Sequence, residues 1–492
     1  MGICPKYGKI GNESITKAAS AVELLFILLE TVVCFMENIG KFLQKLSDAV
    51  WGIPTILFIL GTGIYFTIKS DFFQIRRFPE AWCFFCSKLR PDKTNKDGVS
   101  AYQALCTALA ATVGTGNIAG VAGAICLGGP GSVFWMWISA FLGMIIKCVE
   151  ASLSVRFREK NEAGEYHGGP MQMIENGLGP KWKWLAVLYA FFGVVAAFGV
   201  GNATQINAVL DGIGTASQSI GFEFGDLAKY AVAVILSCIV ALMLSGGAKR
   251  IGKVAEAVVP WASAAYIILG MGVLVLRYEA IPNALYAVIS GAFSPKAVTG
   301  GVIGTMFMAC RTGAARGIFT NEAGMGTASI AHAAADVNHP VQQGFMGIIE
   351  VFLDTIVICT ITALVILCSG IEIPYGVDTG AMLTSEAFSA IYGDWVRVLI
   401  ALFLICFALA TVLGWGYYGL RCAQYLFGYK VWRIFVVFQV LTVLLGAILN
   451  TRTVWQLAEI VNGLMAVPNL LALILLRKQF LRILKSYEGL KG

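Results

Sequence analysis

The chain has 492 residues, of which 58% are hydrophobic and 13% are charged, whereas soluble domains carry about 25% charged residues. Apolar runs longer than about 18 residues recur along it, which excludes a soluble globular protein and predicts an all-α polytopic membrane protein. The net charge of +7 comes from basic residues that gather in certain loops, so it indicates membrane topology and not nucleic-acid binding.

The first elements are an N-terminal segment and a spanning helix. Residues 1–48 place Glu23, Glu30 and Glu37 seven apart, on one face of a helix. This spacing favours an amphipathic helix in the membrane interface, because a span would have to bury the carboxylates. The first span is predicted at 51–68, and the basic loop after it is typical of the cytoplasmic side.

Ten further spans follow, and loop charge alternates from one to the next. Their ranges are 100–126, 131–155, 184–210, 229–246, 254–276, 298–333, 343–369, 395–420, 432–449 and 454–476. The charge bias places the N-terminus outside and a short tail, 481–492, in the cytoplasm. We therefore predict one transmembrane domain of eleven helices at 49–480.

The span at 100–126 contains a polar interruption, TVGTGN at 112–117. Each glycine costs a helix interior about 1 kcal/mol, and hydrocarbon offers no water to satisfy freed backbone groups. A break at this depth makes sense where it lines a binding site. We predict a discontinuous helix that presents carbonyls and amides to a small ligand.

A second interruption is predicted in the span at 298–333, within the run RTGAARG at 311–317. Residues about 100–277 and about 298–477 then form two sets of five spans, each opening with an interrupted helix. Because five is odd, the second set is inverted. Paired interruptions of this kind are typical of inverted-repeat transporters, whose site lies between them. Two unrelated glycine-rich helices packed through small residues are the alternative.

Four stretches carry a resemblance to a known family. They are GTGNIAGV at 114–121, GGPGSVFWMW at 128–137, GIFTNEAGMG at 317–326 and LGWGYYG at 413–419. The chain resembles the alanine or glycine:cation symporter family, the sodium:alanine symporters of prokaryotes, over about residues 49–480. The resemblance implies a five-plus-five inverted-repeat (LeuT-type) core with one extra N-terminal span. It also implies sodium-coupled import of alanine or glycine across a prokaryotic plasma (inner) membrane.

The implied substrate is a small zwitterion, which needs donors for its carboxylate and acceptors for its ammonium. Thr115, Gly116 and Asn117 lie where the first broken helix restarts, and amides at a helix N-terminus favour an anion. We assign the carboxylate to them, with a helix cap as the alternative role of the Asn117 side chain. By resemblance Gln205 also contacts substrate, although a buried glutamine can equally form a hydrogen bond between helices.

The second interrupted helix and the span at 395–420 supply the other substrate candidates. Carbonyls for the ammonium and a floor for the side chain are expected from Thr312, Gly313, Gly317 and Ile318. Trp415 is a candidate lid over a methyl-sized side chain, and its bulk would exclude larger substrates. The alternative for Trp415 is an ordinary packed aromatic residue.

A sodium site is expected beside the first break. The break exposes carbonyls at about Ala110 and Val113, and sodium prefers several oxygen ligands. Thr411 lies four residues before Trp415 on the same helix face, at the place that supplies hydroxyls in the related fold. We expect sodium at Ala110, Val113 and Thr411 as the coupling ion, and no other cofactor. A hydroxyl bonded to its own helix is the alternative for Thr411.

Several ionisable residues fall inside spans, where they are functional candidates by default. They are Lys147, Glu150, Glu350 and Asp354. Lys147 and Glu150 are spaced for a local pair, and a gate or structural network is favoured over proton transfer. Arg311 and Arg316 are expected to face water or to pair with acids such as Glu322.

The alternative function is a proton-coupled small amino-acid transporter of the same fold. A channel is disfavoured because the sequence shows no ring of like charge, and an enzyme because it shows no nucleophile–base pair or metal cluster. The expected partners are alanine or glycine, sodium and the lipid bilayer, with a monomeric chain.

Overall fold

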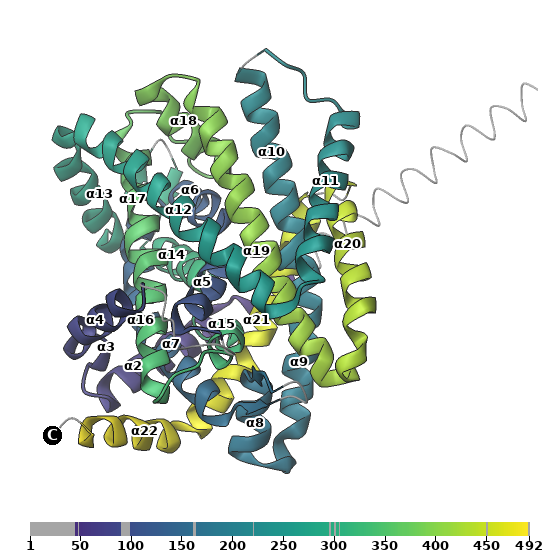
Figure 1. Ribbon diagram of the computed structural model, residues 1–492. Helices are drawn as coiled ribbons and strands as arrows, with labels where there is room; N and C mark the ends of the chain where they lie inside the picture. The colour runs from purple at the N-terminus through teal and green to yellow at the C-terminus, as the bar shows by residue number, and fades with distance from the viewer. Residues whose placement is uncertain are drawn as a thin grey trace, which may run out of the picture. The chain divides into compact units, whose positions relative to one another are not determined.

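The computed structural model describes residues 45–47, 49–89, 99–160, 164–219, 221–294, 297–299, 302–304, 306–448 and 451–490. Val50–Gly492 forms one compact unit, and this unit is described below (Figure 1). The predicted interfacial segment at 1–48 lies almost entirely outside the described residues. The described residues are mainly helical, with two short antiparallel ladders, β1 (Glu159–Lys160) with β2 (Tyr166–His167) and β3 (Ala297–Thr299) with β4 (Val302–Gly304).

The main helices follow the predicted spans closely. They are α2 (Ile53–Lys69), α7 (Gly131–Phe157), α9 (Lys183–Phe198), α10 (Thr204–Ser219), α11 (Asp226–Leu244), α12 (Gly247–Leu276), α16 (Pro340–Val351), α17 (Thr360–Cys368), α19 (Val396–Phe427), α20 (Trp432–Ile448) and α21 (Thr451–Leu475). Two π-helical turns join neighbours in this series, η3 (Gly199–Ala203) between α9 and α10 and η5 (Phe352–Cys359) between α16 and α17. Such turns are frequent at functional sites.

Shorter helices fill the connections. They are α3 (Phe73–Arg76), α4 (Phe78–Lys88), α8 (Pro170–Leu178), α13 (Ile281–Phe293), α18 (Ala381–Tyr392) and α22 (Arg477–Gly489). The sequence did not predict α18, which lies within an acidic loop, or α22, which contains most of the predicted tail. Figure 1 shows α22 lying across the bottom of the view, below α2 and α16.

Seven helical stretches in the described part of the chain are long and apolar enough to cross a membrane. An eighth arises if Ile460–Leu475 and Arg477–Gly489, bent by 60°, count as one span. The other predicted spans correspond to a shorter helix, α2, and to two interrupted helices. The count of eleven and the inverted repeat stay predictions.

The first interrupted helix is confirmed. It consists of α5 (Ala101–Thr112), a single 3-10 turn η1 (Thr115–Asn117) and α6 (Ala119–Gly128), so residues 113–118 form the first break. A capping box fixes the start of α5, because Ser100 Oγ accepts from the Gln103 amide while Gln103 Oε1 accepts from the Ser100 amide.

The second interruption lies elsewhere than predicted. Helix α14 (Met306–Asn321) runs unbroken through 311–317, and the second break is at 322–326, before α15 (Thr327–Ala333). The glycines of the predicted stretch serve packing instead: a Cβ at Gly313 would lie 2.2 Å from Ser132 O of α7. In the second break Glu322, Gly324 and Gly326 take φ of 55°, 92° and 78°, a left-handed conformation that ends the helix.

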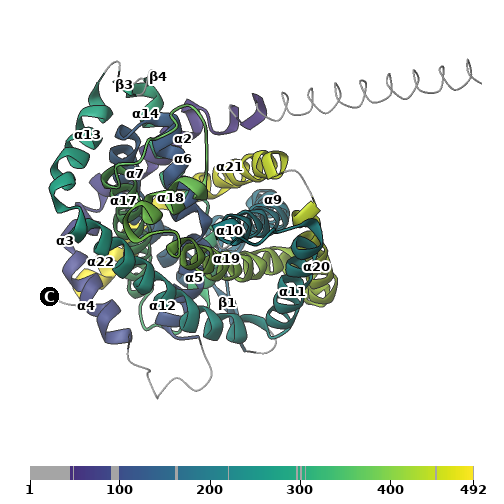
Figure 2. The same cartoon turned by 90° about the horizontal axis from the view of Figure 1, so that it is seen from above.

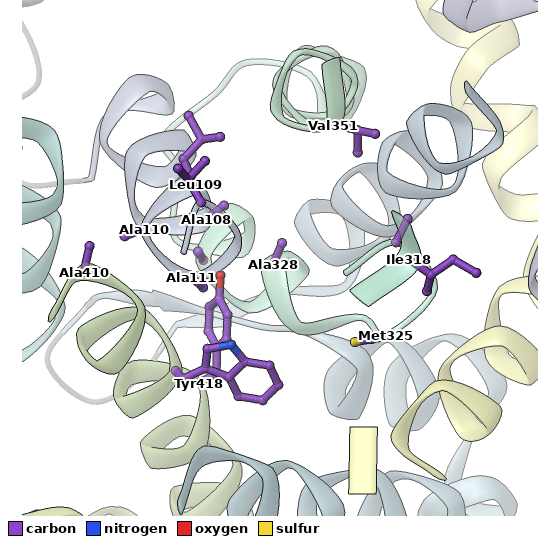
Figure 3. Packing of buried hydrophobic residues seen from close by; sticks show 14 of the residues in the cluster. Ala108, Leu109, Ala110, Ala111, Ile318, Met325, Ala328, Val351, Ala410 and Tyr418 are labelled. Carbon is purple, nitrogen blue, oxygen red and sulfur yellow. The ribbon is translucent and has the colours of Figure 1, made fainter. Parts of the chain in front are cut away.

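Helix α7 packs along both α14 and α16, while α19 packs against α5, α9, α10 and α12. Viewed from above, α6, α7, α14 and α17 form a group beside α9, α10 and α19 (Figure 2). Small side chains let α5 and α19 approach closely, since a Cβ at Gly414 would lie 2.8 Å from Ala111 Cβ. Figure 3 shows Ala111 of α5 and Tyr418 of α19 among the buried residues of this part of the core.

Candidate functional site

The first break is a buried turn closed by its own asparagine. Asn117 Oδ1 accepts a hydrogen bond from the Gly114 amide at 2.9 Å, and Asn117 Nδ2 donates to Asp354 Oδ1 at 2.7 Å. Asn117 therefore closes the turn from within, whereas α6, the restarted half, begins without a side-chain cap, so the helix cap that was its alternative role is not formed there. Thr115 and Asn117 are fully buried, so the polar groups of the break face the protein interior.

Gln205 lies directly beside this break. Thr115 Oγ1 donates to Gln205 Oε1 at 3.1 Å, and Gln205 follows the π-helical turn η3 at the start of α10. The hydrogen bond between helices that was its alternative role is present. The structure thus brings Thr115 and Gln205 together. Their contact with substrate stays a prediction.

Thr411 also faces the first break. A Cβ placed on Gly114 would lie 2.6 Å from Thr411 Oγ1, so the hydroxyl lies against the break backbone. Thr411 is 2% exposed, and within the described residues its Oγ1 has no hydrogen-bond partner. The alternative of a hydroxyl bonded to its own helix is therefore wrong.

The carbonyl end of α5 lies at the same place. In a regular helix Ala110 O would accept from the amide of Gly114, but that amide donates to Asn117 Oδ1 instead. Val113 is the residue at the C-terminal end of α5, where carbonyls lack helical partners. Carbonyls at a helix C-terminus and a bare hydroxyl are ligands that suit a monovalent cation.

Trp415 lies one turn from Thr411 on α19 and contacts the second break. Its Nε1 donates to Glu322 Oε1 at 2.8 Å, and Glu322 Oε2 accepts from Thr327 Oγ1. On the other side, a Cβ at Gly201 would lie 2.1 Å from Trp415 Cβ. Trp415 is 1% exposed, so one turn of α19 contacts both breaks with buried side chains.

The α14 candidates divide into two groups. Ile318 is buried close to the second break, and its carbonyl accepts from the Glu322 amide at 2.8 Å. Thr312, Gly313 and Gly317 lie in regular helix before the break, where both glycines pack against α7. The interruption at 311–317, on which their predicted carbonyl role depended, is absent.

The partner predicted for Lys147 needs correction. Lys147 Nζ pairs with Glu350 Oε1 at 2.9 Å, and His332 Nε2 lies 2.9 Å from Glu350 Oε2. The local pair between Lys147 and Glu150 is not formed among the described contacts. Arg316 pairs with an acid, as expected, and that acid is Asp378, at 3.3 Å.

Sequence reasoning missed two carboxylates as members of this site. Glu322 binds Trp415, and Asp378 lies over α6, with its Oδ1 2.8 Å from where a Cβ on Gly123 would lie. Glu322 stood inside the stretch GIFTNEAGMG that carries the family resemblance, which could have identified it. Asp378 offered no signal beyond its place in an acidic loop.

The sequence profile of the sodium:alanine symporter family matches residues 36–491. The sodium/alanine symporter AgcS of Methanococcus maripaludis is 41% identical over 452 residues, which cover 91% of this chain and 97% of that protein. An uncharacterized transporter of Haemophilus influenzae is 42% identical over 457 residues, which cover 92% of this chain and 96% of that transporter. These relatives are transporters, not enzymes.

A solved structure shows the fold that these helices adopt. The chain is similar to MhsT in complex with L-phenylalanine, with a TM-score of 0.58 and 13% sequence identity, over 78% of this chain and 90% of MhsT. The multi-pass helical membrane architecture, two interrupted helices and the family profile agree with one another. The chain belongs to the sodium:alanine symporter family.

Proposed function

We propose that the chain is a sodium-coupled secondary active symporter that imports alanine or glycine by alternating access. One observation carries the proposal: a single turn of α19 contacts both helix breaks, through Thr411 at Gly114 and through Trp415 at Glu322. A cation and a substrate bound at these two contacts would share the same backbone segments, which is the condition for coupling their binding.

The sodium site is supported by unpaired oxygens. Thr411 Oγ1 has no partner in the described part of the chain, and Ala110 and Val113 supply carbonyls at the negative end of α5. Unwound carbonyls and helix C-termini coordinate sodium in transporters with broken helices. A sodium ion here would neutralise the freed oxygens of the first break.

The substrate site is supported by the restarted half-helix and by Trp415. The backbone of Thr115 and Gly116 begins the positive end of the outer half, which favours a carboxylate. Acceptors for the ammonium come from the second break and the α14 end near Ile318. Trp415, fixed between Gly201 and Glu322, limits the room for the substrate side chain to a small group.

Coupling follows if sodium and substrate each bind the ordered break better than the disordered one. Sodium at the first break would stabilise the turn closed by Asn117, and this turn carries the amides for the carboxylate. Substrate bound there would in turn raise the affinity for sodium by the same factor.

Alanine uptake into proteoliposomes under an imposed sodium gradient tests the proposal, with glycine, serine and leucine as competitors. We expect uptake that depends on the sodium gradient and is inhibited by glycine. Uptake that follows a proton gradient in the absence of sodium would support the alternative, a proton-coupled transporter. That alternative is favoured by one observation: Glu150, Glu322 and Asp354 are buried carboxylates for which the described residues supply no ion pair.

Thr411→Val tests the cation site itself. Valine keeps the shape and removes a buried hydroxyl that lacks a partner in the described protein, so the variant should be as stable as the wild type without sodium. We expect sodium to lose its effect on thermal stability and on alanine uptake. Thr107→Val is the matched control, since Thr107 is also buried but its hydroxyl donates to Gln103 O at 2.8 Å. A normal sodium response in Thr411→Val would exclude this site.

A further inference from the structure

Glu150 of α7 binds the backbone of the second break. Its Oε1 accepts from the amides of Gly324 at 3.0 Å and Gly326 at 3.1 Å, and from Asn469 Nδ2 at 2.7 Å. Both glycines have positive φ, so two successive turns point their amides at one oxygen. The carboxylate therefore fixes the conformation in which the second broken helix is interrupted.

Asp354 makes the corresponding contact at the first break. It is fully buried on the π-helical turn η5, and its Oδ1 accepts from Asn117 Nδ2 at 2.7 Å. Asn117 in turn closes the first break through the Gly114 amide. The carboxylate acts on the first break through the side chain that caps it.

Each carboxylate contacts the break that belongs to the other half of the chain. Helix α7 follows the first broken helix in the chain and binds the second break, whereas α16 and η5 follow the second broken helix and bind the first. Helices α7 and α16 pack along each other and are joined by the buried ion pair of Lys147 with Glu350. Lys147 lies three residues before Glu150, and Glu350 lies four residues before Asp354, about one helical turn in each case.

Packing alone does not account for these carboxylates. Removing a carboxylate from water costs several kcal/mol unless it is paired, and neither Glu150 nor Asp354 has an ion-pair partner within the described residues. Glu150 Oε2 has no hydrogen-bond partner there either. An ionisable residue that is expensive to bury within a membrane indicates a functional role.

We propose that Glu150 and Asp354 are positioning residues that couple the two breaks to each other. Sodium would order the first break, and Asn117 would then hold Asp354 in place. The packed pair α7–α16 connects Asp354 to Glu150, which holds the amides of the second break. This rests on the proposed function, since it takes sodium at the first break. The inference adds a physical route by which sodium at the first break would affect the second break, which supplies acceptors for the substrate ammonium.

The test measures alanine affinity of the purified full-length chain without sodium and with saturating sodium. The quantity of interest is the ratio of the two dissociation constants, because a merely structural role changes both alike. Glu150→Gln keeps the size of the side chain but replaces a charged acceptor, whose hydrogen bonds are about twice as strong, by a neutral one. We expect the sodium-induced gain in affinity to fall by at least about fivefold, within the usual range of coupling factors.

Ser154→Ala is the matched control. Ser154 also lies buried on α7 and its Oγ donates to Ser329 O of α15 at 2.6 Å, a neutral contact to the helix that follows the second break. The ratio in Ser154→Ala should equal that of the wild type. An equal reduction in Ser154→Ala and Glu150→Gln would overturn the proposal, because any loosening of α7 against α15 would then suffice.

Asp354→Asn acts at the other end of the same route and remains informative if Glu150→Gln does not fold. It should lower the same ratio, and the double variant should lower it no further than the more damaging single one, because both interrupt one path. Independent, additive effects would overturn the proposal. A wild-type protein whose alanine affinity ignores sodium would contradict the proposed function, whereas a sodium effect that survives in Glu150→Gln and in Asp354→Asn contradicts only this inference.

Discussion

At the scale of single residues, Trp415 has contacts on two sides that fix its ring. Gly201 leaves room for its Cβ only because a glycine lacks a side chain, and Glu322 accepts its indole N–H at 2.8 Å. Glu322 itself has φ of 55°, a strained conformation for a residue other than glycine. Strain of this kind persists where surrounding contacts enforce it, so the tryptophan and the break stabilise each other.

Trp415→Phe should therefore lower the free energy of unfolding more than the same substitution at another tryptophan. The variant keeps most of the ring and removes a hydrogen bond to a carboxylate, worth about 1.5–3 kcal/mol. Trp137→Phe is the control, since Trp137 Nε1 donates to the neutral Thr360 Oγ1 at 2.8 Å and its loss is worth about 0.5–1.5 kcal/mol. Thermal unfolding in detergent measures both. Equal losses would mean that Glu322 contributes nothing special to the position of Trp415.

The contacts of single residues also show what the sequence could predict of the site. Thr115 was identified from the interruption in its span, and Gln205 and Thr411 with the help of the family resemblance; the structure brings Gln205 and Thr411 to the first break. The partners Asp354 and Glu322 were not assigned, because each contact joins residues far apart in the chain, 237 positions for Asn117 with Asp354. Spacing within one helix carries no information about such pairs.

At the scale of elements, the two broken helices differ in how far their sequences reveal them. The first break combines glycine with residues that cap helices, and the prediction at 112–117 agrees with the structure. In the second broken helix, the glycines at 313 and 317 allow close packing on α7, and the interruption begins later, at Glu322. A sequence does not distinguish a glycine that allows close helix packing from a glycine that adopts a positive φ.

The connection after α17, together with α18, contacts α14, α6 and the first break. Asp378 pairs with Arg316 of α14 at 3.3 Å, the Gly376 amide donates to Cys126 O of α6 at 2.9 Å, and Thr384 Oγ1 of α18 donates to Ile118 O at 3.1 Å. Ile118 belongs to the first break, so α18 contacts the backbone of the break directly. If substrate binds at the first break as proposed, we expect this connection to act as a barrier to its exchange.

Asp378→Asn should weaken that barrier without unfolding the protein. The pair is partly exposed, with 39% of the Asp378 side chain accessible, so its contribution to stability is at most about 1 kcal/mol. We expect alanine exchange in proteoliposomes to accelerate by up to about fivefold, the factor that 1 kcal/mol represents. Asp394→Asn, which breaks a similar exposed pair with Arg397 at the start of α19, is the control. Unchanged exchange in Asp378→Asn would show that this connection is no barrier.

At the scale of the whole molecule, α22 joins parts of the chain that are distant in sequence. Its buried face consists of Phe480, Ile483, Leu484 and Tyr487. Phe480 packs edge-on against Phe66 of α2, and Tyr487 packs against Phe345 of α16. Tyr487 also donates to Glu80 of α4 at 2.6 Å. The helix therefore ties α2, α4 and α16 together.

Tyr487 of α22 contacts Phe345 of α16 and none of Glu350, Asp354 and Glu150 in the contacts of the described residues, so we expect α22 to contribute to stability and not to coupling. Tyr487→Ala removes a buried ring as well as the bond to Glu80, which should cost about 3–5 kcal/mol, whereas Tyr487→Phe keeps the ring and loses only the hydrogen bond. We expect both variants to unfold at lower temperature, alanine more than phenylalanine. The gain in alanine affinity on adding sodium should stay as in the wild type in each. A smaller gain in Tyr487→Phe would mean that the position of α16 as a whole, and not its carboxylates alone, sets the communication between the two breaks.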